Sequence, residues 1–356
     1  MPTPSVIRLE LEKSFEKQGL IMLGVVSLGP EPDFPRFKSW LDAGKNASMA
    51  YMENHQSLRE DPRELLAGVR TAIIFAMPYY LGDKHDPRYS PESPRIAQYA
   101  KFRDYHKILW GKGEVVMKEL HQYDEIGGVG PVGRVLVDSA PILERSLAAR
   151  SHLGFIGKNS CYIHPKKGSF LLLGEILTSM ELPVDIKEPV GHDQRTELGG
   201  CGTCKRCQVA CPTGALDEAY TLDANKCLAY WTIEHRGTIP EKYWPWLEYY
   251  YFGCDICQLV CPYNRGDLPP GDKSLLNGVG NLSLFEVATM SQKLYETKFG
   301  GTPLTRAKRH GLRRNALIAM KVTGAPQLSI ALDAVKSDDH EVLLGTKAQI
   351  QSYSFA

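Results

Sequence analysis

The sequence predicts an α/β (or α+β) domain, a cysteine-rich domain and a short helical segment, in that order. Strand-like and helix-like stretches alternate up to residue 178, eight of the nine cysteines lie between Cys201 and Cys261, and helix-like periodicity returns after residue 310. At about 150 residues per domain, the 356 residues correspond to two or three domains. The 43% of apolar and 23% of charged residues exclude the disordered and fibrous classes.

The first domain is predicted from its alternating pattern. Ile7, Leu11 and Phe15 recur every four residues, which is typical of one face of a helix, and Gly19 supplies a stop. We expect strands at Leu20–Leu28, Thr71–Met77, Arg134–Asp138 and Ser169–Thr178, and helices at Phe34–Leu41, Asp104–Gln122 and Ile142–His152. Because alternation of this kind is typical of α/β folds, we place such a domain at residues 1–190.

Two stretches rich in Pro, Gly and charge separate the remaining parts. The stretch Leu182–Gly200 is interpreted as a linker, and Gly266–Gly280 follows the last cysteine. We therefore place the cysteine-rich domain at 191–275 and a helical module at 276–356. Within that module, apolar residues at 312–320 and at 328–335 each fit a helix.

The cysteines form two runs that resemble those of bacterial ferredoxins. Cys201, Cys204, Cys207 and Cys211 give C-x2-C-x2-C-x3-C before Pro212, the run of a [4Fe–4S] protein whose fourth cysteine binds a second cluster. The second run, Cys254, Cys257 and Cys261 before Pro262, is one ligand short, and Cys227 is its natural replacement. We predict one cluster on Cys201, Cys204, Cys207 and Cys261, and another on Cys211, Cys227, Cys254 and Cys257.

Structural zinc is the alternative, because two C-x2-C pairs are also compatible with a zinc site. The additional cysteine of each run, the Cys-Pro endings and the duplication favour iron–sulfur. Two low-potential clusters imply electron transfer, and hence an external electron donor. Cys161, the ninth cysteine, is interpreted as an ordinary buried thiol.

Other motifs carry weaker signals. Asp138 ends a predicted strand, where a carboxylate either faces a ligand crevice or caps the next helix. Gly128, Gly130 and Gly133 spell G-x-G-x-x-G, but they lead into a strand instead of opening a helix, so we interpret them as a loop. His106 and His152 have no partner at metal-ligand spacing, and we interpret them as structural.

Charge is distributed unevenly, although the net charge is only +1. Between Met290 and Lys321 eight basic residues accompany one acid, Glu296. A solvated helix face is the alternative, but this excess favours an anionic partner, nucleic acid first. The candidate RNA contacts are Lys308, Arg309, Arg313 and Arg314.

The sequence predicts a cytoplasmic protein with reduced thiols. The first residues mix acids with bases and have no apolar core, unlike a signal peptide. The most apolar stretch, Thr71–Leu81, is far shorter than the about 20 residues that span a bilayer. We expect no membrane partner, and nothing demands more than a monomer.

Together, these motifs resemble the epoxyqueuosine reductases, enzymes of queuosine synthesis in tRNA. The matching stretches are REDPRELLAG (59–68), RDYHK (103–107), VDSAPILER (137–145), LGFIGKNS (153–160), GSFLLLGE (168–175), CGTCKRCQVACPTGAL, KCLAYWTIE, GCDICQLVCPYN and RHGLRRNALIAM (309–320). The resemblance implies a cobalamin-binding first domain, two [4Fe–4S] clusters that pass electrons to cobalt, and a HEAT-type module that helps to hold tRNA. It implies that Asp138 is the catalytic acid and that Arg59, Tyr99 and Lys158 lie at the corrin site.

In the implied reaction an epoxide becomes an alkene with loss of water, which needs two electrons and two protons. Asp138 would protonate the opened ring, and burial beside the corrin would raise its pKa. A reductive-dehalogenase-like corrinoid enzyme is one alternative, although it would normally carry an export signal and a tyrosine acid. A ferredoxin-type electron carrier, or a cluster-bearing nucleic-acid-binding protein, is the non-catalytic alternative.

Overall fold

A four-stranded antiparallel sheet forms the centre of the first part of the chain. The computed structural model describes residues 4–80, 96–122, 132–185, 199–275 and 282–353. The strands are β1 (Ile21–Ser27), β2 (Thr71–Pro78), β6 (Leu171–Thr178) and β3 (Gly133–Leu136), in this spatial order, and every neighbouring pair is antiparallel. The four predicted strands are confirmed. Because every pair of strands is antiparallel, the arrangement is α+β. Alternation of strands and helices along the sequence does not reveal the direction in which the strands pair.

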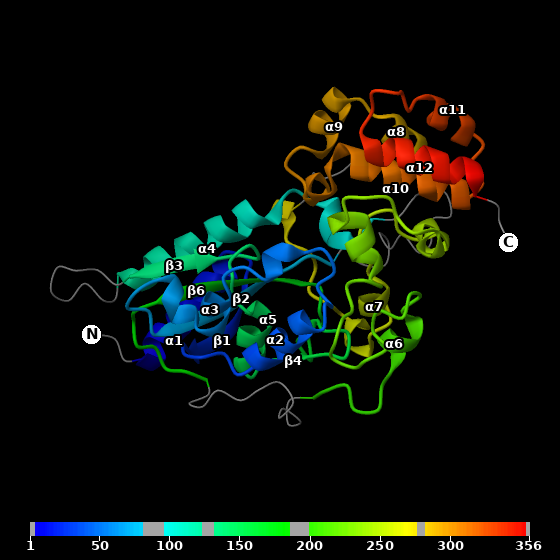
Figure 1. Cartoon of the computed structure of the whole chain (residues 1–356). Helices are drawn as coiled ribbons and strands as arrows, with labels where there is room; N and C mark the ends of the chain where they lie inside the picture. The colour runs from blue at the N-terminus through cyan, green and yellow to red at the C-terminus, as the bar shows by residue number, and fades with distance from the viewer. Residues whose placement is uncertain (1–3, 81–95, 123–131, 186–198, 276–281, 354–356) are drawn as a thin grey trace.

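The sheet is covered on both faces. β2 is buried along its whole length, with Ile73, Phe75 and Met77 in one hydrophobic cluster and its alternate residues in another. Helices α1 (Pro4–Lys17) and α4 (Tyr105–His121) pack on the first face, and α5 (Glu144–Arg150) packs on the second (Figure 1). This sandwich explains why β2 is apolar at every position instead of at alternate ones.

Shorter elements complete this part of the chain. Between β1 and β2 lie α2 (Phe34–Asp42), η1 (Ala50–Met52), α3 (Gln56–Glu60) and η2 (Pro62–Leu65); η5 (Gln98–Lys101) precedes α4, and β4 (Phe155–Ile156) pairs with β5 (Tyr162–Ile163). The hairpin β4–β5 was missed because two-residue strands leave no periodicity. Gly133 begins β3, whereas Gly128 and Gly130 lie outside the described residues. No helix in the described ranges combines the length and apolar character that a membrane span requires.

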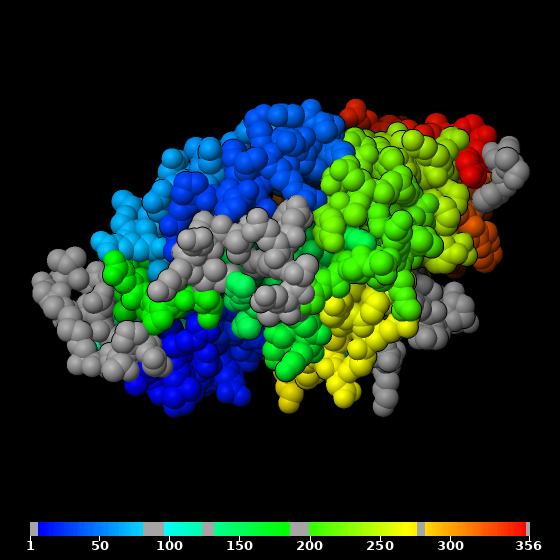
Figure 2. Space-filling view, turned by 90° about the horizontal axis from the view of Figure 1, so that it is seen from below, coloured from blue at the N-terminus to red at the C-terminus, as the bar shows by residue number. Residues whose placement is uncertain are grey.

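The cysteine-rich segment contains only short helices. They are α6 (Arg206–Ala210), the π-helical turn η7 (Tyr230–Glu234), η8 (Glu241–Glu248), α7 (Ile256–Leu259), η9 (Pro262–Asn264) and η10 (Lys273–Leu275). Part of this segment, coloured green in Figure 2, lies open on the lower face between the N-terminal residues in blue and the C-terminal residues in red.

The C-terminal part is built around α10 (Lys308–Val322). Around it lie α8 (Leu284–Thr289), α9 (Gln292–Phe299), η11 (Pro303–Ala307), α11 (Leu328–Asp333) and α12 (Glu341–Ser352). The two predicted helices are α10 and α11, and α8, α9 and α12 were not predicted. Trp244, Tyr250 and Phe252, from between the cysteine runs, share one hydrophobic core with Leu312 and Leu317. The core of the helical part therefore extends across the expected boundary at residue 275.

Two buried polar residues of α10 fasten this inter-cysteine segment. The guanidinium of Arg314, only 1% exposed, donates to the main-chain oxygens of Trp231, His235 and Gly237 at 2.5–2.9 Å. Asn315 donates to the oxygens of Thr232 and Tyr251, both at 2.8 Å. Burial lowers the pKa of Arg314 to about 9, which shows how far this group is removed from water.

We predict that Arg314→Met destabilises the protein by about 3 kcal/mol or more, because each buried group left without a partner costs ~1–3 kcal/mol. Chemical denaturation followed by circular dichroism measures the change. Lys308→Met, in the exposed first turn of the same helix, should stay within about 0.5 kcal/mol of the unaltered protein. Equal stabilities of the two variants would contradict the role assigned to Arg314.

Candidate functional site

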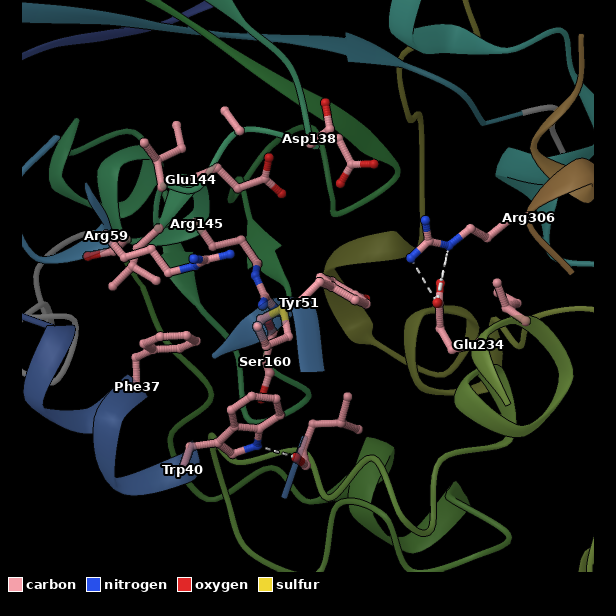
Figure 3. Close-up of a pocket in the computed structure, with 18 of the residues that line it drawn as sticks. Phe37, Trp40, Tyr51, Arg59, Asp138, Glu144, Arg145, Ser160, Glu234 and Arg306 are labelled. Atoms are coloured by element: carbon pink, nitrogen blue, oxygen red, sulfur yellow. Dashed lines mark hydrogen bonds and ion pairs between the residues drawn. The ribbon is translucent and has the colours of Figure 1, made fainter. Parts of the chain in front are cut away.

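A cavity of about 1580 Å³ lies between the sheet, the inter-cysteine segment and the helical part. This is larger than the ~300–1,000 Å³ of most small-molecule sites. Four residues predicted from the sequence line it: Asp138, Arg59, Tyr99 and Lys308. Figure 3 shows Asp138 and Glu144 at one side, Arg59 and Phe37 at a second, and Arg306 with Glu234 across from them.

Asp138 lies two residues beyond β3, in an unusual backbone conformation. Its φ of 50° is in the left-handed region, which an aspartate adopts only with some strain. Its carboxylate accepts hydrogen bonds at 2.8 Å from the hydroxyl of Tyr105 and from Nε2 of His106. Asp104, the N-cap of α4, accepts from the main-chain N–H of His106 and contacts its Nδ1 at 2.6 Å. The cap of one helix thereby orients the imidazole toward the end of β3.

These contacts decide where the proton resides. Burial raises the pKa of Asp138, but the hydrogen bonds from His106 and Tyr105 outweigh it, and the pKa is lowered. The hydrogen bond to Asp138, followed by that to Asp104, raises the pKa of His106 to about 9. Two donors thus stabilise the charged form of Asp138, whereas the upward shift expected from burial beside a corrin stays a prediction. At neutral pH the pair holds its proton on His106.

A second carboxyl group faces the same space. Glu144, the first residue of α5, reaches toward Asp138 (Figure 3). Burial, and then the negative charge of Asp138, raise its pKa to about 7. Behind it, Glu175 of β6 is fully buried, and neither of its carboxyl oxygens has a hydrogen-bond partner among the described residues. Burial, and then the charges of Glu144 and Asp138, raise its pKa well above the usual range. Glu144 thus titrates near neutrality beside a carboxyl group that stays protonated.

The second side of the cavity is basic and aromatic. The guanidinium of Arg59 lies over the ring of Phe37, 5.6 Å from its centroid, and donates to the main-chain oxygen of Asn54. Arg145 likewise donates to the main-chain oxygen of Ser160. Neither guanidinium forms an ion pair with a carboxylate among the described residues, so both charges remain available to a bound anion.

The third side of the cavity joins three separate parts of the chain. Arg306 of η11 forms a bidentate ion pair with Glu234 of η7, at 2.8–3.1 Å, and lies over the ring of Tyr51 of η1. Lys308 is exposed beside it. The helical part therefore presents two cations to the cavity: Arg306, which is paired with Glu234, and Lys308, which has no ion-pair partner among the described residues.

The cysteines whose charges act on one another suggest two groups of thiols. Cys207 interacts with Cys201 and Cys261, and Cys261 interacts with Cys201 and Cys204. In the other group, Cys254 interacts with Cys227 and Cys211, and Cys257 interacts with Cys254 and Cys227. These neighbours agree with the crossed sets expected from the sequence, although Cys161 is a neighbour of both Cys261 and Cys227. The described residues contain no group of three or more His, Cys, Asp or Glu side chains arranged to hold a metal ion, so the two ligand sets stay a prediction.

Two further predictions concern residues beside these groups. Lys158 does not line the cavity: its main-chain N–H points at Sγ of Cys201, at 3.3 Å, and its Nζ donates to main-chain oxygens of Gly202 and Cys204. Its expected contact with a corrin is therefore not supported by this arrangement. Cys161 is half-buried and hydrogen-bonded to Cys257, which the sequence did not indicate.

The structure corrects the expected RNA contacts. Arg313 and Arg314 are 3% and 1% exposed, and their donors are taken up by main-chain oxygens, Asp339 and Asn315. Arg309 is half-buried and bonds the oxygen of Met290. Only Lys308 of the four is exposed. The number of basic residues was misleading, because a buried guanidinium can also donate hydrogen bonds to main-chain oxygens. Composition alone cannot distinguish such a buried arginine from one whose charge lies on the surface.

Comparisons with known proteins decide the family. The model "Epoxyqueuosine reductase QueG, DUF1730" matches residues 59–139, and the model "4Fe-4S double cluster binding domain" matches residues 200–264. An epoxyqueuosine reductase of Pseudomonas aeruginosa is 35% identical over 343 residues, which cover 94% of this chain and 90% of the relative. The chain belongs to the epoxyqueuosine reductase family.

Other members agree with this assignment. The epoxyqueuosine reductase of Escherichia coli is 39% identical over 249 residues, 69% of this chain and 62% of that protein. A crystal structure of a selenomethionine-labelled epoxyqueuosine reductase matches with a TM-score of 0.83 at 24% identity, covering 98% of this chain and 90% of that one. An epoxyqueuosine reductase with an epoxyqueuosine-modified tRNA stem loop matches with a TM-score of 0.81 at 23% identity, with the same coverage.

Sequence reasoning missed several residues of the site. His106 was set aside as structural, and Tyr51, Glu144 and Arg306 were not considered. For His106 and Glu144 a signal existed, because they lie within the stretches RDYHK and VDSAPILER that carry the family resemblance. For Tyr51 and Arg306 none existed, since only folding brings residues 255 positions apart into contact.

The crossed cysteine grouping predicts which double variants share a cluster. Cys201→Ser with Cys261→Ser should damage one site only and leave about four irons per chain after anaerobic reconstitution, whereas Cys201→Ser with Cys211→Ser should damage both. Iron and sulfide quantification measures the result. Because each double variant removes two thiols, they control for one another, and an uncrossed pairing would reverse the two values.

Proposed function

We propose that this protein reduces epoxyqueuosine to queuosine at the wobble position of tRNA. The observation that carries the proposal is the proton-holding pair of Asp138 and His106 in a large cavity, in a chain of this family. An electron carrier of the ferredoxin type would need neither the cavity nor the pair.

We further propose that the protein is a cytoplasmic monomer. We assign residues 276–356 to a HEAT-like module that binds tRNA.

Cobalamin is the cofactor that we assign to the cavity. Its residues fit a large planar group with amide and phosphate substituents: the volume suffices, the rings of Phe37 and Trp40 offer flat apolar contacts, and Arg59 and Arg145 offer charge without a paired carboxylate. Tyr99 lines the same space. When bound there, cobalamin supplies a nucleophilic cobalt centre.

Two [4Fe–4S] clusters are assigned to the two cysteine groups, with an external donor of single electrons. The first group takes Cys201, Cys204, Cys207 and Cys261, and the second takes Cys211, Cys227, Cys254 and Cys257. Thiolates are the usual ligands of such clusters, which supply electrons one at a time. Lys158 supports the first group, because its N–H and Nζ contact the loop that carries Cys201 and Cys204.

The protein's own contribution is the supply of protons. Converting the epoxide to an alkene breaks both carbon–oxygen bonds and releases the oxygen as water, so two electrons and two protons are consumed. Asp138 faces the substrate space and His106 holds a proton against it, so together they deliver the first proton to the opened ring. Glu144, with a pKa of about 7, is placed to supply the second.

The tRNA would approach from the helical part. Bases of an anticodon loop can be splayed out singly into a pocket, while phosphate contacts fix the register. Lys308 is exposed where the cavity opens, and Arg309 is next to it on α10. We assign the phosphate contacts to these two residues, and no longer to Arg313 and Arg314.

The proton assignment predicts a particular pH profile. Since Glu144 loses its proton near pH 7 and His106 keeps its own until the pH rises through about 9, turnover should decline in two steps, first above pH 7 and then above pH 9. In His106→Gln, Asp138 loses the cation that lowers its pKa and must itself hold the proton, so the decline should begin below pH 7. Asp138→Asn should abolish turnover, and Glu144→Gln should slow it severely. Queuosine formation, quantified by mass spectrometry of digested tRNA with a chemical reductant, measures these rates.

Iron, cobalt and tRNA affinity should be retained in all three variants, which separates lost chemistry from lost folding. Undiminished reduction by Asp138→Asn would overturn the acid assignment. An unchanged alkaline limb in His106→Gln would show that the imidazole does not store the proton.

The RNA assignment predicts a change in salt dependence. Lys308→Ala with Arg309→Ala should weaken binding of an anticodon stem loop, and the slope of log K against log salt should become shallower by about 1 to 2, because each phosphate contact contributes ~0.7–0.9. Filter binding at several salt concentrations measures the slope. Lys17→Ala on α1, distant from the cavity in Figure 1, should leave it unchanged. Identical slopes for both variants would remove Lys308 and Arg309 from the interface.

A further inference from the structure

The two cysteine groups differ in what surrounds them. In the first run, five intervening residues are exposed: Gly202, Thr203, Lys205, Arg206 and Val209. In the second run, the neighbours Phe252, Gly253 and Asp255 are buried. Asp255 accepts from the main-chain N–H of Gln98, at 2.7 Å, and Gln98 precedes Tyr99 in the cavity wall. The loop of the first run, with Cys201, Cys204 and Cys207 of the first group, therefore faces solvent, although Cys261 of that group is buried, and Cys254 and Cys257 of the second group lie toward the cavity.

The exposed loop of the first run has a composition that favours docking. Val209 of α6 is 85% exposed, more than any other large hydrophobic residue described. Lys205 and Arg206 are exposed directly beside it, and among the described residues neither side chain forms an ion pair or a hydrogen bond. The first cysteine run thus contains an exposed apolar side chain, Val209, beside two exposed cations. This segment belongs to the green surface in Figure 2.

We propose that Lys205, Arg206 and Val209 form the docking site for an acidic one-electron carrier protein. The inference rests on the proposed function, since it presumes a cluster at the first cysteine group. Electron transfer requires a close approach, and this exposed loop itself carries Cys204 and Cys207. Opposite charge steers such an encounter and speeds association without demanding high affinity. Two carriers dock in succession, and each is oxidised by one electron for every two-electron reduction.

A carrier of opposite charge fits better than a nucleic acid at this place. The exposed cations of this loop are Lys205 and Arg206, which lie beside an exposed aliphatic side chain, and Lys158 donates to main-chain oxygens of the same loop. Lys308, in contrast, lies on α10, beside Arg306 of η11. A weak and transient contact also suits a partner that must leave after giving up its electron.

The test compares two double charge reversals on reconstituted holoprotein. Lys205→Glu with Arg206→Glu alters the proposed site, and Lys17→Glu with Lys118→Glu makes the same charge change on α1 and α4, at the opposite end of the molecule in Figure 1. The probe is an acidic bacterial-type ferredoxin, and isothermal titration calorimetry at low salt measures its Kd. We expect at least tenfold weaker binding for the first pair and little change for the second, with the difference shrinking at 0.5 M salt because of screening. Val209→Ser should weaken binding less.

Turnover separates this proposal from the one on which it rests. With dithionite as reductant, all variants should form queuosine at the rate of the unaltered protein and contain the same iron, whereas ferredoxin-driven turnover should fall in Lys205→Glu with Arg206→Glu. Equal ferredoxin affinity in both double variants would overturn the docking site. Absence of dithionite-driven queuosine formation by the unaltered holoprotein would instead overturn the proposed function.

Discussion

The buried guanidinium of Arg314 is the interaction on which the arrangement of this molecule depends. By bonding three main-chain oxygens between residues 231 and 237, it holds the segment between the cysteine runs against α10. That segment begins after Cys227, carries Glu234 into the cavity wall and ends at Cys254. One side chain of the helical part therefore fixes two cysteines and one side of the cavity, and the helical part cannot be regarded as an independent appendage.

The strained end of β3 organises the chemistry in a comparable way. Asp138 adopts a left-handed conformation that places its carboxylate against α4, where Tyr105 and the capped His106 donate to it. Because a cationic imidazole neutralises the carboxylate, the pair stores a proton at neutral pH without requiring a protonated aspartate. A neighbouring carboxyl that titrates near pH 7 belongs to α5, on the other side of the same turn. Two elements with different sequence signals thus converge on one proton supply.

Local patterns were sufficient to predict the four strands of the central sheet and four helices of the first part, because each depends on the spacing of nearby residues. The crossed cysteine groups, which join distant residues, stay a prediction. The antiparallel pairing was not predictable, since strand direction is decided by connections that leave no periodicity. The contacts of Arg306 with Tyr51 and Glu234 were equally impossible to predict, because they join three segments that are distant in the sequence. The donors to Asp138 were unforeseen for a related reason: burial was anticipated, whereas the two groups that lower the pKa of Asp138 are supplied by the first turn of α4.

The basic segment shows most clearly why charge must be located before it is interpreted. Its excess of cations favoured an anionic partner, yet two of the four residues expected to contact it are buried and bond main-chain oxygens. Removing a guanidinium such as Arg313 would expose the main-chain oxygen of Ala288 and leave Asp339 without its partner at 2.7 Å. A loss of RNA binding in such a variant would then report unfolding of the helical part. Phosphate recognition has to be sought instead at the start of α10, where the exposed Lys308 can be removed without disturbing the core.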